Sequence, residues 1–153
     1  GIPFFFCGEE MYRSKLGEKN TYNMPDKYNA IDWALKSEHR DLVEFYKGLI
    51  AMRKYHPAFS LGTAEAVREH LRFIENDNVA AVGFVLDNLE GIDPSERIVV
   101  LMNGSRESVE FDIPAGEYKW ICDGDTIVPQ GIGRLSTGGK VEVAPISAII
   151  LAI

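Results

Sequence analysis

The clearest candidates for acid–base chemistry are two adjacent carboxylates near the start of the chain, Glu9 and Glu10. Neighbouring residues on a strand point to opposite faces, so adjacency alone does not let two carboxyls act on the same bond. Arg13 and Lys15 follow within a few residues and could neutralise them. The sequence therefore predicts an anchoring role, in which one carboxylate holds the following segment in place through Arg13 or Lys15.

Cysteine and histidine, which could attack a substrate or bind a metal, are sparse. Cys7 and Cys122 lie in apolar surroundings, and the sequence contains neither Cys-x-x-Cys spacing nor a second His or Cys close to His56. Free cysteines in apolar surroundings are usually buried. We therefore expect two buried free thiols, a His56 that serves at the end of a helix, and neither a metal nor a cofactor.

The charge of the chain narrows the range of partners. The net charge is −7 over 153 residues, and no run of Lys and Arg is long enough to form a phosphate-binding stripe. No apolar stretch reaches the roughly 20 residues that a membrane-spanning helix needs. The sequence therefore predicts neither a nucleic-acid partner nor a membrane partner.

The uneven distribution of acidic residues indicates two parts. Residues 1–57 carry nine Lys/Arg and eight Asp/Glu, whereas residues 58–153 carry seven and fifteen. The composition changes at Pro57, where we place the boundary. The chain also begins inside an apolar run and without Met, which favours a piece of a longer protein.

The residue pattern of the first part, residues 1–57, predicts a strand, a long connection and a helix. Residues 2–7 are continuously apolar, as in strands that are buried on both faces of a parallel sheet. From Gly8 to Lys36 the periodicity disappears, and a connection of this length is typical of a functional loop. A helix is expected from Ser37, its N-cap, to Pro57, with apolar residues at steps of three and four.

After Pro57 the pattern is that of short strands separated by turns such as Asn103-Gly104. Short strands at this spacing, without a helical pattern between them, predict an antiparallel β-sandwich. The expected strands cover residues 67–73, 79–86, 97–102, 108–112, 117–122, 126–128, 140–143 and 147–153.

Two motifs in the first part match a known family. Residues 1–15 read GIPFFFCGEEMYRSK, and residues 20–33 read NTYNMPDKYNAIDW. Together they resemble the eighth strand and following loop of pullulanase-type debranching enzymes of the α-amylase superfamily. The pattern there is G-x-P-F-x-x-x-G-E-E-x-x-R-T-K and then N-S-Y-x-x-P-D-x-x-N-x-I-D-W. The departures are Ser14 for the usual threonine and Thr21 for the usual serine.

The resemblance implies an α+β fragment. Residues 1–57 would be the last strand, long loop and last helix of a (β/α)8 barrel, and residues 58–153 a C-terminal antiparallel β-sandwich domain. It implies a parent enzyme that hydrolyses α-1,6 branches in pullulan, amylopectin and glycogen with retention, and the remainder of the barrel as a partner. It also places the three catalytic carboxylates ahead of Gly1, so no catalytic residue is expected in this chain. A retaining glycosidase needs two carboxyls about 5–5.5 Å apart across the scissile bond.

The long loop is the candidate substrate site, because loops after barrel strands build the active site. Amide, carboxyl and guanidinium groups hydrogen-bond sugar hydroxyls, and aromatic rings cover the apolar side of a pyranose. Loop scaffolding is the alternative role, since Asn and Asp also bond their own backbone in turns. The substrate-binding candidates are Tyr22, Asp26, Arg13, Asn20, Asn23 and Asn29.

Two other classes of function stay open. A self-contained β-sandwich carbohydrate-binding module, without enzyme activity, would need exposed aromatic residues on one face of the sandwich. A purely structural β-domain would need none. Trp33, Tyr118 and Trp120 are the aromatics in question, and all three are expected to pack against other residues instead of forming a sugar platform.

Overall fold

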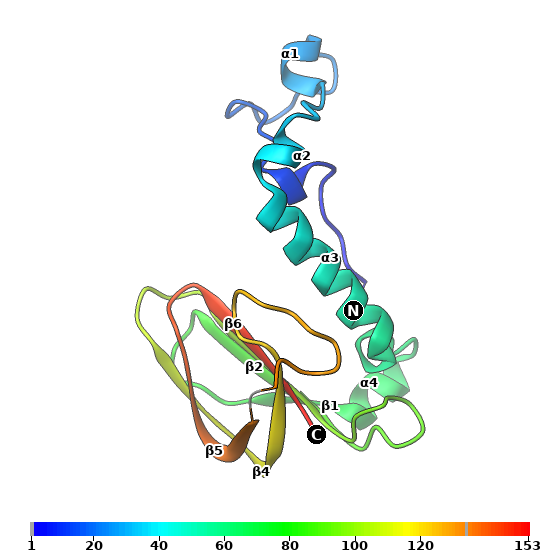
Figure 1. The fold of residues 1–153 in the computed structure, drawn as a ribbon, viewed down its shortest axis with the longest axis vertical. Coiled ribbons are helices and arrows are strands. Elements are labelled where there is room, and N and C mark those ends of the chain that lie inside the picture. Colours follow the sequence, from blue (N-terminus) through cyan, green and yellow to red (C-terminus); the bar gives the residue numbers. More distant parts are fainter. Residues whose placement is uncertain (1, 134) are drawn as a thin grey trace. The chain divides into compact units, whose positions relative to one another are not determined.

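The computed structural model describes residues 2–133 and 135–153, which divide into two compact units, 2–47 and 48–153 (Figure 1). The long helix α3 (Arg40–Tyr55) begins in the first unit and ends in the second. All of the strands among the described residues belong to the second unit. The predicted boundary at Pro57, between a barrel end and a β-domain, stays a prediction.

The larger unit is built on one antiparallel sheet with the strand order β1-β2-β3-β6-β4-β5. Strand β6 pairs with β3 along one side and with β4 along the other, so it joins the two halves of the sheet. The strands are β1 (Leu71–Ile74), β2 (Ala81–Leu86), β3 (Ile98–Asn103), β4 (Val109–Cys122), β5 (Leu135–Val143) and β6 (Ser147–Ala152).

Each face of the sheet carries its own apolar cluster, because successive side chains of a strand point to opposite faces. On β3, Val99 and Leu101 belong to the first cluster, which also takes residues from β2, β4, β5 and β6. Ile98 and Val100 belong to the second, which contains Met52 of α3 and part of the short helix η2 (Pro57–Ser60). Strand β3 is therefore covered on both sides.

The sheet curls, so that β2 and β4 meet across the first cluster although they are not neighbours in the sheet. A Cβ at Gly83 of β2 would lie 3.0 Å from the ring of Phe111 on β4 and 3.2 Å from Cβ of Ile74 on β1. These distances are shorter than ordinary van der Waals contacts, so the approach of the two strands needs a residue without a side chain at position 83.

The expected strand over residues 67–73 is wrong in its first half. Residues up to His70 belong to the helix α4 (Ala64–His70), and β1 begins only at Leu71. The side chain of Thr63 accepts a hydrogen bond from the N–H of Ala66 at 3.1 Å, which caps the helix. The cap gives the N–H of Ala66 a hydrogen-bond partner within the helix, so this donor does not need a neighbouring strand.

The expected strands 108–112 and 117–122 are one strand, β4, with a register shift between Ile113 and Glu117. The break that was expected between these two strands, at residues 113–116, is a bulge within β4, because β5 remains paired with β4 on both sides of it. Residues 126–128 contribute a single bridge, between Cys122 and Ile127. The antiparallel α+β character is confirmed, but one curled sheet takes the place of the expected two-sheet sandwich.

The smaller unit contains short helices joined by irregular segments. They are η1 (Glu9–Met11), α1 (Asp26–Asn29) and α2 (Leu35–Glu38), followed by the first part of α3. Ser37 lies inside α2, and α3 begins at Arg40. The helix expected ahead of Pro57 is confirmed as α3, but the expectation that Ser37 caps it is wrong. The cause is His39, whose backbone, at φ −109° and ψ 46°, leaves the helical region and separates the two helices.

Residues 2–7 form no strand, and their side chains are exposed: Ile2 by 95% and Phe4 by 96%. The ring of Phe5 makes one edge-to-face contact, with its centre 5.6 Å from that of Tyr46 on α3. A strand needs a hydrogen-bonded neighbour, and the described part of this unit contains no strand to supply it. The expectation that residues 2–7 form a strand buried on both faces is therefore wrong in this structure, where the run is neither a strand nor buried.

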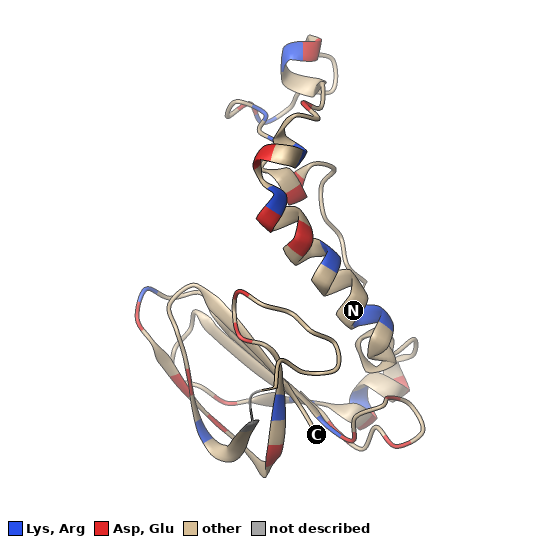
Figure 2. Ribbon diagram, in the orientation of Figure 1, with Lys and Arg blue, Asp and Glu red and all other residues tan. Residues whose placement is uncertain are grey.

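Acidic and basic residues are interspersed along α3 (Figure 2). Its exposed pair Glu44 and Lys47 lies at 2.8 Å within one turn, a kind of contact that adds little stability. Among the residues that the structure describes, no helix is both long and apolar enough to cross a membrane.

Candidate functional site

Arg13 organises the start of the long loop. Its Nη1 donates to the carbonyl oxygen of Cys7 at 3.0 Å, and its Nη2 donates to the carbonyl oxygen of Asn29. The guanidinium also lies 5.1 Å from the centre of the Phe6 ring. Gly8 allows this turn with φ 97°, and a Cβ there would lie 2.6 Å from Cβ of Arg13. Arg13, a substrate candidate, thus joins the two ends of the loop.

Asn29 closes the loop with both ends of its amide. Its Nδ2 donates to the carbonyl oxygens of Thr21 and Met24, at 2.7 and 2.9 Å. Its Oδ1 accepts from Nζ of Lys15 at 2.7 Å. Partial desolvation, together with the neighbouring charge of Arg13, lowers the pKa of Lys15. Both amide protons of Asn29 are used inside the loop, so this substrate candidate also has a scaffolding position.

The other four candidates lie together on the segment that Asn29 holds, and all of their side chains are exposed. They are Asn20, Tyr22, Asn23 and Asp26. Tyr22 is 82% exposed, and Asp26 begins the single turn of α1. The loop thus presents an aromatic ring, two amides and a carboxylate to solvent.

The residues around this segment partly follow expectation. Glu10 anchors the loop as predicted for one of the two carboxylates, but through a different partner: its Oε2 accepts from the N–H of Gly8 at 3.0 Å. Tyr12 stands edge-on to His39, with ring centres 4.8 Å apart. Trp33 is 64% exposed, so the expectation that it packs is wrong in this structure.

The two cysteines are free, as expected, but only one is buried. Cys122 lies in the second apolar cluster, and its burial raises the pKa of its thiol. Cys7 is exposed, because the run that contains it is not covered. No group of three potential metal ligands occurs among the residues that the structure describes.

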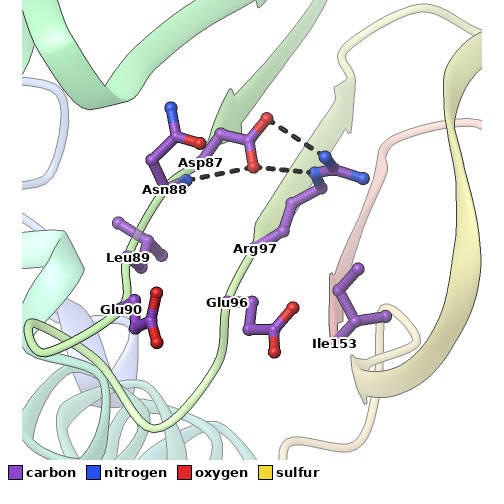
Figure 3. Close-up of a pocket in the computed structure, with 7 residues that line it drawn as sticks. All are labelled: Asp87, Asn88, Leu89, Glu90, Glu96, Arg97 and Ile153. Atoms are coloured by element: carbon purple, nitrogen blue, oxygen red, sulfur yellow. Dashed lines mark hydrogen bonds and ion pairs between the residues drawn. The ribbon is translucent and has the colours of Figure 1, made fainter.

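The larger unit has a polar cavity of about 230 Å³ where β2 ends and β3 begins (Figure 3). Arg97 donates to Asp87 through Nε, at 3.0 Å from Oδ1, and through Nη2, at 3.2 Å from Oδ2. Arg72 donates to the same carboxylate, and so does the backbone N–H of Asn88 at 3.0 Å. The cavity is lined by Asp87, Asn88, Leu89, Glu90, Glu96, Arg97 and Ile153.

These contacts set the charge of the cluster. Burial opposes the ionisation of Asp87, but the hydrogen bonds from Arg97 and Arg72 outweigh it and hold the pKa of Asp87 below its ordinary value. The bond to Asp87, followed by that to Tyr118, raises the pKa of Arg97. A carboxyl with a depressed pKa stabilises the fold above its unfolded-state pKa, and this contribution is lost as the pH falls through its folded-state pKa.

We predict that Asp87→Asn lowers the free energy of unfolding by about 1.5–3 kcal/mol at neutral pH, because Arg97 and Arg72 lose charge-assisted hydrogen bonds. The variant should also lose less stability than the native chain on acidification below the ordinary Asp pKa of about 3.9. Urea unfolding at pH 7 and at pH 3 to 4 measures both effects. The control is Glu110→Gln, which removes an exposed pair with Lys140. Equal acid sensitivity of the variant and the native chain would contradict the prediction.

Sequence reasoning missed this cluster because its members are far apart along the chain. The register that places Arg72 opposite Val85, and Leu86 opposite Ile98, brings the ends of three strands together. Opposite charges at strand ends become a usable signal only when the register is known.

The aromatic residues of β4 pack in the core, as predicted. Tyr118 is fully buried and donates its hydroxyl to the carbonyl oxygen of Pro114 at 3.0 Å, and Trp120 is 6% exposed. A carbohydrate-binding module would need such rings on an exposed face. These two are therefore not available for that role.

Comparison with protein families and curated proteins gives consistent matches. Residues 67–126 match the family profile described as pullulanase, all-beta domain. The pullulanase of Bacillus subtilis (strain 168) is 32% identical over 145 residues, which cover 94% of this chain and 19% of the relative. The isoamylase of a Flavobacterium species is 29% identical over 133 residues, covering 74% and 17%. The chain thus spans about a fifth of the length of these relatives.

Solved structures extend the similarity to the fold. Pullulanase from Bacillus acidopullulyticus matches 95% of this chain and 18% of its own, with a TM-score of 0.86 and 34% identity. Pullulanase from Anoxybacillus sp. LM18-11, solved in complex with maltotetraose, matches 99% and 21%, with a TM-score of 0.85 and 30% identity. The similarity therefore includes the residues ahead of the sheet.

Proposed function

Because this chain belongs to the pullulanase-type debranching enzymes of the α-amylase superfamily, we propose that it is part of an enzyme that hydrolyses α-1,6 branches in pullulan, starch or glycogen. The observation that carries the proposal is the agreement of sequence and fold over nearly the whole chain. Pullulanases in complex with maltose, maltotriose and maltotetraose are among the similar structures, which supports an α-glucan as the ligand. The parent enzyme would act with retention and without a cofactor.

In this proposal, residues 1–57 are the end of the catalytic barrel, and residues 58–153 are the C-terminal β-domain of the parent enzyme. Residues 2–7 would be the eighth strand, and α3 the last helix. The exposure of Ile2 and Phe4 supports this assignment, because an apolar strand of this kind is covered by neighbours on both sides in a barrel. The remainder of the barrel is therefore the proposed structural partner.

The loop between these elements would contribute to substrate binding with two kinds of residue. Arg13 and Asn29 hydrogen-bond the loop itself and would hold its shape. The exposed residues would touch the glucan: the Tyr22 ring is free to cover a pyranose, and the Asp26 carboxylate to accept from hydroxyls. Asn20 and Asn23 would add amide contacts from the same segment.

The test is made in the complete parent enzyme with Tyr22→Ala and Asp26→Ala. Loss of a stacking ring or a charge-assisted hydrogen bond should remove about 1–3 kcal/mol of transition-state binding. At about 1.4 kcal/mol for each factor of ten, kcat/KM on pullulan should fall roughly ten- to hundred-fold. The melting temperature should stay close to that of the native enzyme, because both side chains are exposed.

Two further variants serve as controls. Tyr22→Phe keeps the ring and removes only the hydroxyl, so it should retain most of the activity. Asn29→Ala removes three hydrogen bonds inside the loop and should lower the melting temperature as well as kcat/KM. Native kinetics for Tyr22→Ala and Asp26→Ala, with a lowered melting temperature, would instead assign both residues to the scaffold.

A further inference from the structure

A buried histidine lies where three segments of the larger unit meet. His56 stands between the end of α3 and the start of η2, and its side chain is 2% exposed. Its two partners are Asp93, in the segment between β2 and β3, and Pro129, in the segment between β4 and β5. The side chain of Asp93 is completely buried. One imidazole ring therefore connects parts of the chain that are far apart in sequence.

Each ring nitrogen of His56 faces an oxygen atom. Nδ1 lies 2.7 Å from Oδ1 of Asp93, and Nε2 lies 2.9 Å from the carbonyl oxygen of Pro129. A peptide carbonyl oxygen has lone pairs and no proton to donate. The contact with Pro129 therefore requires a proton on Nε2.

The carboxylate of Asp93 is likewise occupied as an acceptor. Its Oδ1 also accepts from the N–H of Ser95 at 3.0 Å, and its Oδ2 accepts from the N–H of Ala58 at 3.1 Å. Both oxygens thus already receive a backbone donor. The short contact with His56 is satisfied when Nδ1, too, carries a proton and donates it to Oδ1.

We propose that His56 is held as an imidazolium, and that its ion pair with Asp93 is a latch that fixes the end of α3 on the sheet. Opposite an ionised Asp93, a neutral imidazole, which has one donor and one acceptor nitrogen, would leave one of its two contacts as two facing lone pairs. Hydrogen bonds to ionised groups are shorter and stronger than neutral ones. The rings of Tyr55 and Phe59 stand edge-on to the imidazole, with centres 5.0 and 6.3 Å away.

The position of the latch gives it a structural consequence. Met52, one turn before His56, and Ala58, two residues after it, both pack in the second apolar cluster. Fixing the imidazole therefore helps to hold the two buried residues of the helical segment, Met52 and Ala58, against the sheet. The same contact also holds the segment between β2 and β3, which begins with Asp87 of the charged cluster.

Nitrogen-15 NMR of the histidine rings tests the charge in the full chain. At pH 7.5 an imidazole in an unfolded chain is mostly neutral, because its ordinary pKa is about 6.5. We expect both ring nitrogens of His56 to be protonated under these conditions, each coupled to one hydrogen. His56→Gln assigns the signals, and the more accessible His39 is the internal reference. A ring with one protonated and one bare nitrogen would overturn the proposal.

Asp93→Asn tests the latch, because it keeps the size of the side chain and removes the charge. One nitrogen of His56 should lose its proton, so that no unpaired charge stays buried, and the equilibrium constant for unfolding should still rise roughly 100-fold, because a buried ion pair has lost one partner. Glu90→Gln, an exposed carboxylate in the same segment, is the matched control and should change this constant less than about threefold. A doubly protonated His56 and native stability in Asp93→Asn would overturn the proposal.

Discussion

Incubation of this chain alone with pullulan is expected to release no reducing sugar. Retaining hydrolysis needs a nucleophile and an acid/base carboxyl about 5–5.5 Å apart across the bond. In the function proposed above, these residues would lie on barrel strands of the parent enzyme ahead of Gly1. Of the two adjacent carboxylates inside the chain, Glu10 is already hydrogen-bonded to the backbone of Gly8. Reducing-end assays over many hours, compared with a heat-denatured sample, measure the result.

The complete parent enzyme under the same conditions is the positive control and should hydrolyse pullulan readily. The expected difference is complete, since rate enhancements by enzymes are commonly a millionfold or more. Hydrolysis by the chain itself, which persists through further purification and disappears on denaturation, would contradict the expectation. It would also require a catalytic pair within residues 1–153.

Replacement of Phe111 by alanine is expected to lower the free energy of unfolding of the larger unit by about 3–5 kcal/mol. The ring is 1% exposed and fills the space above Gly83, where β2 and β4 approach each other. The variant loses the burial of the ring and gains a cavity. Gly83, which faces this cavity, has no side chain that could fill it. Urea unfolding, followed by the fluorescence of the buried Trp120 in the same cluster, measures the loss.

Phe73→Ala is the matched control, because the same side chain is removed from a position on β1 that is 72% exposed. Its expected effect is within about 0.5 kcal/mol, as for surface substitutions generally. Equal destabilisation by the two substitutions would show that the first cluster is not packed as described.

The strands that the sequence predicted well are those with a regular apolar pattern. Residues 79–86, 97–102 and 147–153 correspond closely to β2, β3 and β6. In such segments the alternation or continuity of apolar residues is sufficient to predict a strand, because it reflects which side chains are buried. The expectation failed where a contact outside the apolar pattern determines the secondary structure. One such contact is the cap by Thr63, which favours the helix α4. The other is the pairing with β5, which continues on both sides of Pro114 and keeps β4 a single strand.

The motif in the sequence identified the candidate loop. It did not distinguish the residues that hold the loop in shape from those that the loop exposes to solvent. Arg13 and Asn29 have the same chemistry as residues that bind sugars, so composition could not separate them from Asn20 and Asn23. Only the hydrogen bonds to Cys7, Thr21 and Met24 distinguish a residue that shapes the loop from one that it presents. The Asp87 cluster was hidden for a similar reason, since strand register is a property of the fold.

The central position of β6 has a consequence for the biosynthesis of the protein. β6 (Ser147–Ala152) lies between β3 and β4, although it follows all the other described strands along the chain and is translated after them. While the nascent chain is shorter, β1-β2-β3 and β4-β5 are two separate pieces, each with an unpaired edge and an uncovered apolar face. Such edges invite association with other chains. The ribosome-bound intermediate should therefore depend on chaperones until residue 152 has left the exit tunnel and the two pieces can join.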